Sequence, residues 1–492
     1  MDGQQSNITM TDQITNFYYN KFQAPAQANW IKKYNPHNGK ILSLVQNSNK
    51  EDILRVLEIA QEGFYAWSKL TSVQRGQYLF DVVELMNNKK DILARCVAQE
   101  SGKSYQDAMG EVQGAIMQGR FFAGEGMRLY GKTINSGIPG RSSSTKREPL
   151  GIAALIVPSN TPIANIAWKL FPALICGNSV ILKASEDTPK IANLIAKIFV
   201  QAKIPKGIFN ILHGDANVGK FLVKNKNISL ISFTGSTSAG KWIAAEAGKR
   251  LARVSLELGG KNALVVCDDA NIDHAVQWAI SSAFSNAGQR CAAASRIILF
   301  RSIQEEFCKK FIEAARQLKL GTGQDSDLGP VINKKSQLRI LGYLNEAKKQ
   351  GLKILLGGRK PRDVNLKNGF YIEPTVIMSP PFHSKINQHE IFGPVTCIFL
   401  VNNIDEAIIL ANKSDYGLTS SIHTTSIEKS LKYTNQIRAG LVNVNLGTHG
   451  SEPQMPFGGF GISGNGTREP GIEALDVYSE LKNISFFSPD QF

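Results

Sequence analysis

The chain alternates between segments with helical hydrophobic spacing and short apolar segments typical of buried strands. Apolar residues recur every three or four positions over 51–69, 73–98 and 103–125, which predicts three long helices. In the following part of the chain, short apolar strands alternate with helical segments such as 188–203 and 216–224. This rhythm is typical of βαβ units and predicts the α/β fold class with a largely parallel sheet.

A polar stretch from Gly131 to Pro149 interrupts this pattern. It contains a Pro139–Gly140 turn between strand-like flanks and is interpreted as a projecting β-hairpin. The tail, 479–492, is strand-like again, and we expect it to pair with the hairpin. Because an isolated hairpin is marginal in water, the arm is expected to be ordered by a second copy of the chain, in a homodimer or homotetramer.

Composition places the chain among globular proteins of two to four domains. It has 492 residues, of which 42% are hydrophobic and 20% charged. The start, MDGQQSNITMTDQ, shows no signal-peptide pattern, and no apolar run approaches the roughly 20 residues of a membrane span. Six cysteines are too few for a disulfide framework. We therefore expect a cytoplasmic protein that does not bind membranes.

The excess of basic residues does not indicate a nucleic-acid partner. The formal net charge is +15, but lysines and arginines are scattered, often as pairs such as Lys309–Lys310 and Lys348–Lys349. This pattern favours solvated helix faces over a binding patch. A positive balance would also steer anionic substrates and dinucleotides toward the protein.

Cys291 is the cysteine whose surroundings differ from those of a core thiol. It follows Gly288 and Arg290 and precedes three alanines, whereas Cys176 and Cys267 lie in apolar strand-like runs. A flexible turn that opens a small-residue helix would present the thiol at a helix N-terminus, where the dipole lowers its pKa. Cys291 is therefore a candidate nucleophile, and the alternative is a packed small residue.

Two further polar residues stand where catalysis could use them. Glu257 lies between two leucines, before Gly259 and Gly260, where burial would raise its pKa into the range of a general base. The alternative is a surface residue paired with Lys261. Asn160 follows a predicted strand and could donate to an oxyanion, although loop asparagines more commonly cap helices or form turns.

A nucleotide site is predicted where the strand-like ISLISF meets the turn Thr234–Thr237 and a helical segment follows. A strand, a glycine turn and a helix N-terminus together bind pyrophosphate. A literal GxGxxG at Gly459–Gly464 follows Pro456–Phe457 instead of a buried strand, so it is rejected as a dinucleotide fingerprint. The seven histidines show no metal-ligand spacing, and no metal is expected.

Six motifs, in order along nearly the whole chain, resemble those of the aldehyde dehydrogenase superfamily. They are Arg147–Gly151, Phe233–Thr237, Leu256–Lys261, Gly288–Cys291, Glu390–Pro394 and Pro456–Gly459. The resemblance implies an NAD(P)-dependent oxidation of an aldehyde to a carboxylate, through a cysteine thiohemiacetal and a thioester. It implies Cys291 as the nucleophile, Glu257 as the general base, and Asn160 with the Cys291 backbone N–H as the oxyanion hole.

The resemblance also implies a cofactor set and three domains. The cofactor is NAD, with NADP possible, and Glu186 favours NAD. The residues expected to bind it are Pro158, Ser159, Lys183, Glu186, Gly219, Phe233, Thr234, Gly235, Ser236, Leu258, Glu390 and Phe392. The domains are a Rossmann-like dinucleotide-binding domain (1–126 and 150–257), an α/β catalytic domain (258–447) and a small β oligomerisation domain (127–149 and 479–492).

The resemblance places the helix after Asn160 along the entry of the aldehyde, and the polarity of the residues there leads us to expect a short polar aldehyde or a semialdehyde. The residues expected to meet it are Thr161, Asn165, Trp168, Arg290 and His449. Most are polar, and Arg290 and His449 could receive a carboxylate. Two alternatives stay open: a CoA-acylating aldehyde dehydrogenase, which would have little use for Glu257, and a non-catalytic protein that retains the fold.

Overall fold

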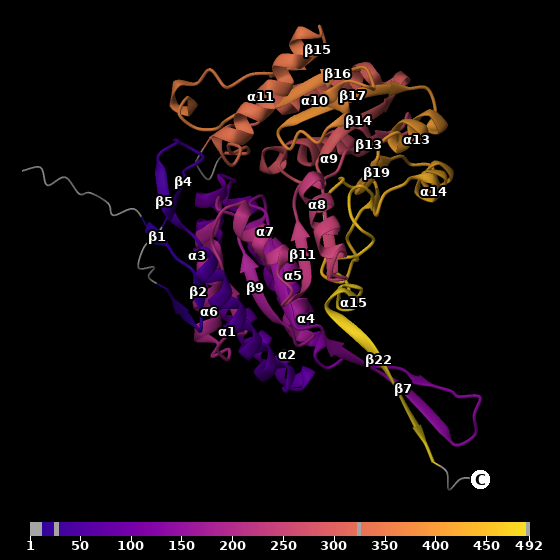
Figure 1. Ribbon diagram of the computed structural model, residues 1–492. Coiled ribbons are helices and arrows are strands. Elements are labelled where there is room, and N and C mark those ends of the chain that lie inside the picture. Colours follow the sequence, from indigo (N-terminus) through magenta and orange to yellow (C-terminus); the bar gives the residue numbers. More distant parts are fainter. Residues whose placement is uncertain (1–11, 24–28, 322–325, 489–492) are drawn as a thin grey trace, which may run out of the picture.

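The computed structural model describes residues 12–23, 29–321 and 326–488, and two seven-stranded sheets form the centres of its two lobes (Figure 1). The opening residues 1–11, most of the segment examined for a signal peptide, lie outside these ranges, as do 489–492 of the predicted tail. In the described part of the chain, no helix is long and apolar enough to cross a membrane.

The first sheet has the strand order β12-β11-β8-β9-β10-β2-β3. The five strands from β12 to β10 are parallel, and β2 runs antiparallel to β10. The strands are β2 (Phe17–Tyr18), β3 (Lys21–Phe22), β8 (Ile152–Ile156), β9 (Ser179–Lys183), β10 (Phe209–Ile211), β11 (Ile228–Thr234) and β12 (Arg253–Glu257). The connecting helices are α5 (Pro162–Ile175), α6 (Pro189–Gln201), α7 (Ala216–Lys224) and α8 (Thr237–Gly248). The predicted parallel α/β pattern is confirmed for this region.

Four long helices lie between β3 and β8 in the chain, where three were predicted. They are α1 (Lys50–Ser68), α2 (Ser72–Asn88), α3 (Lys90–Ser101) and α4 (Tyr105–Glu125). The single helix predicted over 73–98 is wrong, because Lys89 leaves helical geometry with φ −112° and ψ 14°. The polar run at this point has no apolar residue to extend either buried face, so the chain can turn there.

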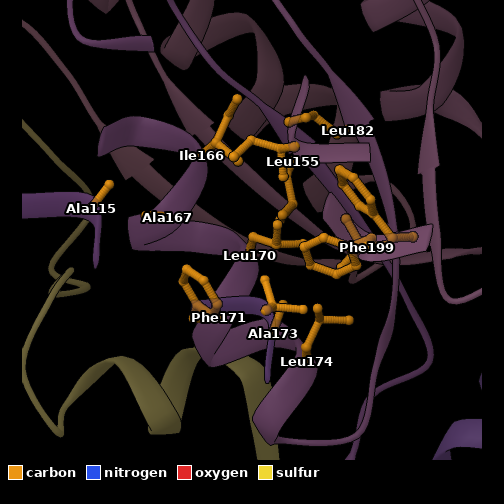
Figure 2. Close-up of a cluster of buried hydrophobic side chains, with 14 of the residues drawn as sticks. Ala115, Leu155, Ile166, Ala167, Leu170, Phe171, Ala173, Leu174, Leu182 and Phe199 are labelled. Atoms are coloured by element: carbon orange, nitrogen blue, oxygen red, sulfur yellow. The ribbon is translucent and has the colours of Figure 1, made fainter. Parts of the chain in front are cut away.

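The helix α5 is buried on nearly all sides and carries the wall of the site described below. Leu155 of β8, Leu170 and Leu174 of α5, and Phe199 of α6 form part of one apolar cluster with Leu182 (Figure 2). Side chains in such cores occupy fixed rotamers at close packing. The first turn of α5 is therefore attached to a rigid support.

The second sheet has the order β15-β16-β17-β14-β13-β19-β20 and is parallel except for β15. Its strands are β13 (Asn262–Val266), β14 (Ala294–Phe300), β15 (Lys353–Leu356), β16 (Thr375–Met378), β17 (Val395–Val401), β19 (Thr419–His423) and β20 (Leu441–Val444). Its helices are α9 (Ile272–Phe284), α10 (Gln304–Gln317), α11 (Lys334–Lys349), α12 (Lys385–Gln388), α13 (Ile404–Asn412) and α14 (Ile427–Gln436). Because β12 ends at Glu257 and β13 begins at Asn262, one short segment joins the two sheets.

A three-stranded arm projects from the body (Figure 1). It pairs β6 (Thr133–Ile134), β7 (Arg141–Pro149) and β22 (Ser479–Phe487), and α15 (Ala474–Tyr478) leads into the last strand. The ladder between β7 and β22 runs from Pro149 opposite Ser479 to Arg141 opposite Phe487. The predicted hairpin and its pairing with the tail are therefore confirmed.

Two small sheets complete the described structure. One pairs β1 (Asp12–Ile14), β4 (Asn29–Tyr34) and β5 (Ile41–Asn47). The other pairs β18 (Tyr416–Gly417) with β21 (Phe460–Gly461). The GxGxxG sequence therefore contains the short strand β21, and no helix begins in it.

Candidate active site

The short segment between the two sheets contains two glycines, Gly259 and Gly260, that lie in close contact with neighbouring atoms. A Cβ atom at Gly259 would lie 2.2 Å from Glu390 Oε2, and one at Gly260 would lie 2.5 Å from the carbonyl oxygen of Cys291. Neither approach tolerates a side chain. The two glycines therefore let Glu257, at the start of the segment, lie close to the loop that carries Cys291.

Cys291 lies in a turn that leads into β14, and not at the start of a helix. The preceding residues Asn286 and Ala287 have left-handed backbone angles, each with φ 53°. The side-chain amide of Asn262 donates to the carbonyl oxygens of Cys291 at 2.7 Å and Ala293 at 2.9 Å. The predicted small-residue helix is wrong because the alanine run enters a strand buried between β13 and β17, and that burial outweighs alanine's helix propensity.

The Cys291 thiol accordingly lacks the helix dipole expected to acidify it. Burial, together with the nearby carboxylates of Glu390 and Glu257, raises its pKa to about 12, while the Ala292 amide and Arg290 act in the opposite direction. The predicted depression of the pKa is wrong for this structure. A low-dielectric site with acidic neighbours disfavours the thiolate.

Glu257 is buried at the end of β12, and no described residue hydrogen-bonds to either of its carboxylate oxygens. Burial raises its pKa well above the usual value, and the neighbouring Glu469 raises it further. Lys261 is not its partner, because the Lys261 ammonium donates to the carbonyls of Ile386 and His389, each at 2.9 Å. The raised pKa is thus confirmed, and the alternative of a surface ion pair is wrong.

A fully buried ion pair lies behind Glu257. Lys169 Nζ is 2.6 Å from Glu469 Oε2, and both side chains have no exposed surface. Glu469 also accepts from the hydroxyls of Ser232 at 2.8 Å, Ser255 at 2.7 Å and Tyr478 at 3.2 Å. The Lys169 ammonium is therefore already paired with Glu469. It lowers the pKa of Glu257, but by less than burial and Glu469 raise it.

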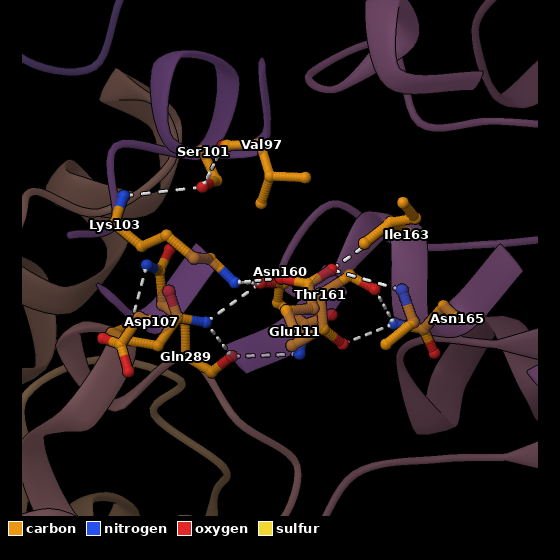
Figure 3. A network of polar contacts seen from close by, with 12 residues as sticks. Val97, Ser101, Lys103, Asp107, Glu111, Asn160, Thr161, Ile163, Asn165 and Gln289 are labelled. Atoms are coloured by element: carbon orange, nitrogen blue, oxygen red, sulfur yellow. Dashed lines mark hydrogen bonds and ion pairs between the residues drawn. The ribbon is translucent and has the colours of Figure 1, made fainter. Parts of the chain in front are cut away.

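Asn160 faces the loop that carries Cys291. Its side-chain Nδ2 donates to the carbonyl oxygen of Gln289 at 3.0 Å, and its backbone carbonyl oxygen accepts from Lys103 Nζ and Asn286 Nδ2 (Figure 3). A carboxamide nitrogen has two N–H groups, so a second donor remains. Asn160 does not cap α5, because Thr161 occupies the N-cap position.

Asn160, Glu257 and Cys291 line one cavity of about 580 Å³. Of the residues predicted to bind cofactor, those on its wall are Pro158, Thr234, Gly235, Ser236, Leu258, Glu390 and Phe392. The residues predicted for the cofactor that lie outside this wall are Ser159, Lys183, Glu186, Gly219 and Phe233. The cavity therefore joins the catalytic candidates to the predicted nucleotide turn.

The nucleotide turn has the local structure predicted for it. The strand β11 ends at Thr234, and the hydroxyl of Ser236 caps α8 by accepting from the amide of Ala239 at 3.4 Å. Lys183, at the end of β9, is 3.1 Å from Glu186. These positions lie at the carboxyl edge of a parallel sheet, where α/β folds bind dinucleotides, so the residues fit such a cofactor.

The other end of the cavity mixes polar and aromatic walls. Thr161, Asn165 and Trp168 line it as predicted, and Asn165 Nδ2 donates to Thr161 Oγ1 at 2.7 Å. Sequence reasoning missed Phe457, whose ring meets that of Trp168 edge-on at 5.3 Å. The signal was present, because Phe457 belongs to one of the six motifs but was given no role. Thr237 and Gly259 also line the cavity and lie within predicted motifs without an assigned role. The other wall residues missed from the sequence are Ala164, Ser238, Arg339, Tyr343, His389 and Tyr416.

Arg290 and His449 do not line this cavity. Arg290 Nη2 is 3.5 Å from Asp107 Oδ1, and His449 Nε2 is 3.0 Å from the hydroxyl of Ser281. Burial lowers the pKa of His449 to about 4, with Arg290 contributing. The expectation that His449 offers a positive charge to a carboxylate is therefore wrong near neutral pH.

The comparisons with known proteins agree with this geometry. The model of the aldehyde dehydrogenase family matches residues 22–484, and the chain belongs to this family. It is an NAD(P)-dependent oxidoreductase that acts on aldehydes.

Three relatives illustrate the match. The chain is 35% identical to the alpha-ketoglutaric semialdehyde dehydrogenase of Bacillus subtilis over 483 residues, 97% of this chain and 99% of that protein. It is 38% identical to the D-glyceraldehyde dehydrogenase (NADP(+)) of Picrophilus torridus over 457 residues, 92% of each. A crystal structure of betaine aldehyde dehydrogenase from Staphylococcus aureus in complex with NAD+ superposes with a TM-score of 0.94 at 32% identity, covering 96% of this chain and 95% of that one.

Replacing Glu390 by Gln should speed alkylation of Cys291. Burial raises the pKa of Glu390 to about 7, so above that pH its charge opposes formation of the thiolate. Removing the charge lowers the thiol pKa, and well below that pKa the thiolate fraction rises roughly tenfold for each unit of decrease. The measurement is the rate of iodoacetamide labelling of Cys291 from pH 7 to 10, followed by mass spectrometry.

The control for this experiment is Glu246→Gln, which removes a surface carboxylate paired with Lys249. It should label at the wild-type rate. A wild-type rate that is already maximal below pH 8, or equal rates in Glu390→Gln and wild type at pH 9, would contradict the raised thiol pKa.

Proposed function

We propose that Cys291, Glu257 and Asn160 oxidise a short polar aldehyde to its carboxylate. The observation that carries this proposal is that all three line one cavity, which also reaches the Thr234–Ser236 turn. The residues on that wall would hold the nicotinamide end of NAD, and Lys183 and Glu186 would hold its adenosine ribose. When bound, NAD supplies the acceptor for the aldehyde's hydride.

The protein's own residues supply the remaining chemistry. The Cys291 thiolate bonds to the aldehyde carbon, and the carbonyl oxygen takes up the negative charge. Asn160 Nδ2 and the Cys291 backbone N–H donate to that oxygen, as an oxyanion hole does. After oxidation leaves a thioester, Glu257 takes a proton from water, the water oxygen bonds to the acyl carbon, and the Cys291 thiolate leaves.

The two raised pKa values set the direction of the pH dependence. Burial raises the pKa of both Cys291 and Glu257, so both reactive forms become more populated as pH rises. Turnover should therefore increase from neutral toward alkaline pH. The presence of Glu257 also favours hydrolysis of the thioester over its transfer to CoA.

Glu257→Gln should separate the two halves of the reaction. Its amide cannot take the proton from water, so the thioester accumulates and one equivalent of NADH per site forms in a burst. Cys291→Ser should give neither burst nor turnover, because a serine hydroxyl is not an accessible anion near neutral pH. The measurement is stopped-flow NADH absorbance, with and without CoA. Wild-type turnover in Glu257→Gln, or release of the acyl group that requires CoA, would refute the assignment.

The proposed substrate class follows from the polar wall. Thr161 and Asn165 line the cavity beside Trp168 and Phe457, and they give its wall polar groups that an apolar substrate would desolvate without a hydrogen bond in return. The names of the relatives from Bacillus subtilis and Picrophilus torridus denote polar aldehydes. Arg290 lies outside the cavity wall and contacts Asp107, but it is the neighbour of Cys291, and its buried Nε has no hydrogen-bond partner in the described part of the chain. We propose that Arg290 receives the carboxylate of a semialdehyde.

A panel of aldehydes tests the substrate class. We expect kcat/KM with NAD to be highest for succinic semialdehyde or a longer ω-oxo acid, followed by glycolaldehyde, with hexanal and benzaldehyde last. Arg290→Gln should lower the values for the two oxo acids and spare glycolaldehyde, which has no carboxylate. If hexanal or benzaldehyde ranks first by tenfold, the proposed class is wrong.

The proposed cofactor preference is NAD over NADP. Glu186 would accept hydrogen bonds from the ribose hydroxyls, whereas a 2′-phosphate there would meet a like charge costing on the order of 1 kcal/mol. Lys183, 3.1 Å away, and Lys220 offset part of that repulsion. We expect a higher kcat/KM for NAD, and a smaller difference in Glu186→Gln. A tenfold preference for NADP in the wild type would contradict this assignment.

The proposed assembly is a homodimer or homotetramer in the cytoplasm. The strand β22 is an edge strand of the arm, with Leu481 and Phe486 63% and 67% exposed. An exposed apolar edge strand favours pairing with another chain. All six cysteines are free thiols, which suits a reducing compartment such as the cytoplasm. We also propose the three-domain division given above. Light scattering at micromolar concentration should give a multiple of the 53.9 kDa chain mass, and a monomeric mass would refute the assembly.

A further inference from the structure

Two buried charges hold the backbone beside Asn160. Lys103 Nζ lies 2.6 Å from Glu111 Oε2, and the two side chains are only 2% and 5% exposed. The same ammonium donates to the carbonyl oxygen of Asn160 at 2.7 Å (Figure 3). Burying a charge is costly unless it is paired and hydrogen-bonded. Here both charged groups contact the segment that carries the proposed oxyanion donor.

Glu111 holds the other side of the same segment. Its Oε1 accepts from the backbone amides of Ile163 at 2.9 Å and Ala164 at 3.2 Å, in the first turn of α5. The N-cap residue Thr161 makes no side-chain capping bond. A helix N-terminus needs acceptors for its free amides, and a carboxylate there also complements the helix dipole. Glu111 of α4 therefore caps α5 from a different helix.

The helix α4 contacts the nucleophile's loop as well. Asp107, one turn before Glu111, is 3.5 Å from Arg290, the neighbour of Cys291. Asn160 Nδ2 in turn donates to the carbonyl oxygen of Gln289 in that loop. One helix therefore fixes the proposed oxyanion donor and touches the residue next to the nucleophile.

The backbone of Lys103 is itself held in place. Gly102, which ends α3, has φ 82°, a left-handed angle that favours glycine. A Cβ there would lie 2.8 Å from Pro330 Cγ and 3.0 Å from Pro36 Cβ. The corner between α3 and α4 thus packs against the lobe that carries Cys291, which limits the positions open to the Lys103 ammonium.

We propose that Lys103 and Glu111 are positioning residues for the oxyanion step. They hold the carbonyl of Asn160 and the first amides of α5, so that the Asn160 carboxamide presents its free N–H at the aldehyde oxygen. The proposal rests on the oxyanion role proposed for Asn160. Loss of an oxyanion donor lowers kcat by about 100- to 1000-fold, and a displacement of roughly 1 Å can cost about 100-fold.

A double-mutant cycle on the full-length protein tests this proposal. The variants are Lys103→Met, Glu111→Gln, Asn160→Ala and the double variant Lys103→Met/Asn160→Ala. Each single variant should lower kcat, Lys103→Met by about 100-fold, while the NAD dissociation constant measured by fluorescence stays as in the wild type. Glu111→Gln should lose less, because its amide oxygen still accepts from the α5 amides.

The decisive value is the effect of Lys103→Met in the Asn160→Ala background. If Lys103 acts through Asn160, the second substitution should lower kcat only slightly further, since coupled residues are not additive. A general loss of structure would instead multiply the two effects. The control is Lys310→Met, which removes a surface lysine paired with Asp273 and Glu306 and should keep wild-type kcat.

The outcomes distinguish this proposal from the one it rests on. Wild-type kcat in Asn160→Ala would overturn the oxyanion role itself. A large loss in Asn160→Ala with wild-type kcat in Lys103→Met, or with fully multiplicative effects in the double variant, would overturn the positioning role alone. If Lys103→Met does not fold, the double variant Lys103→Met/Glu111→Gln takes its place in the cycle. It removes both charges together, so no unpaired charge remains buried.

Discussion

The four residues between β12 and β13 are the constraint on which the site depends. They are too few to let the lobes separate, so the carboxyl end of the first sheet and the amino end of the second must meet there. The strand β12 ends at Glu257, and β13 begins at Asn262, whose side-chain amide donates to the carbonyl oxygen of Cys291. The proposed base and the proposed nucleophile thus come together from two sheets because one backbone segment joins them.

The same enclosure determines the electrostatics of the site. Burial raises the pKa values of Cys291, Glu257 and Glu390, and the acidic groups reinforce one another's effect on the thiol. The fully buried ammonium of Lys169, which lowers the pKa of Glu257, is paired with Glu469. The enclosure therefore disfavours the charged forms of all three groups. The rate is expected to depend on fixed donors such as Asn160 more than on a preformed thiolate.

Local patterns predicted much of the fold, while tertiary contacts decided the rest. The strand and turn at Thr234–Gly235, the hairpin and its pairing with the tail follow from short-range periodicity and turn residues. The environment of Cys291 could not be predicted locally, because the alanine run after it has helix propensity but leads into the buried strand β14. Lys103 and Glu111 gave no signal, since their contacts with the Asn160 segment join residues more than 50 positions apart. Phe457 stood in a visible motif, but only the fold shows that it faces Trp168.

The most direct test of the account is to find where the acyl group resides during turnover. Wild-type protein mixed with aldehyde and NAD, quenched in acid within milliseconds and digested, should carry a hydroxylamine-sensitive acyl adduct on the peptide containing Cys291. The other five cysteines, Cys96, Cys176, Cys267, Cys308 and Cys397, should carry none. An adduct on Cys308, or turnover with no adduct at any cysteine, would contradict the assignment of Cys291 as the nucleophile.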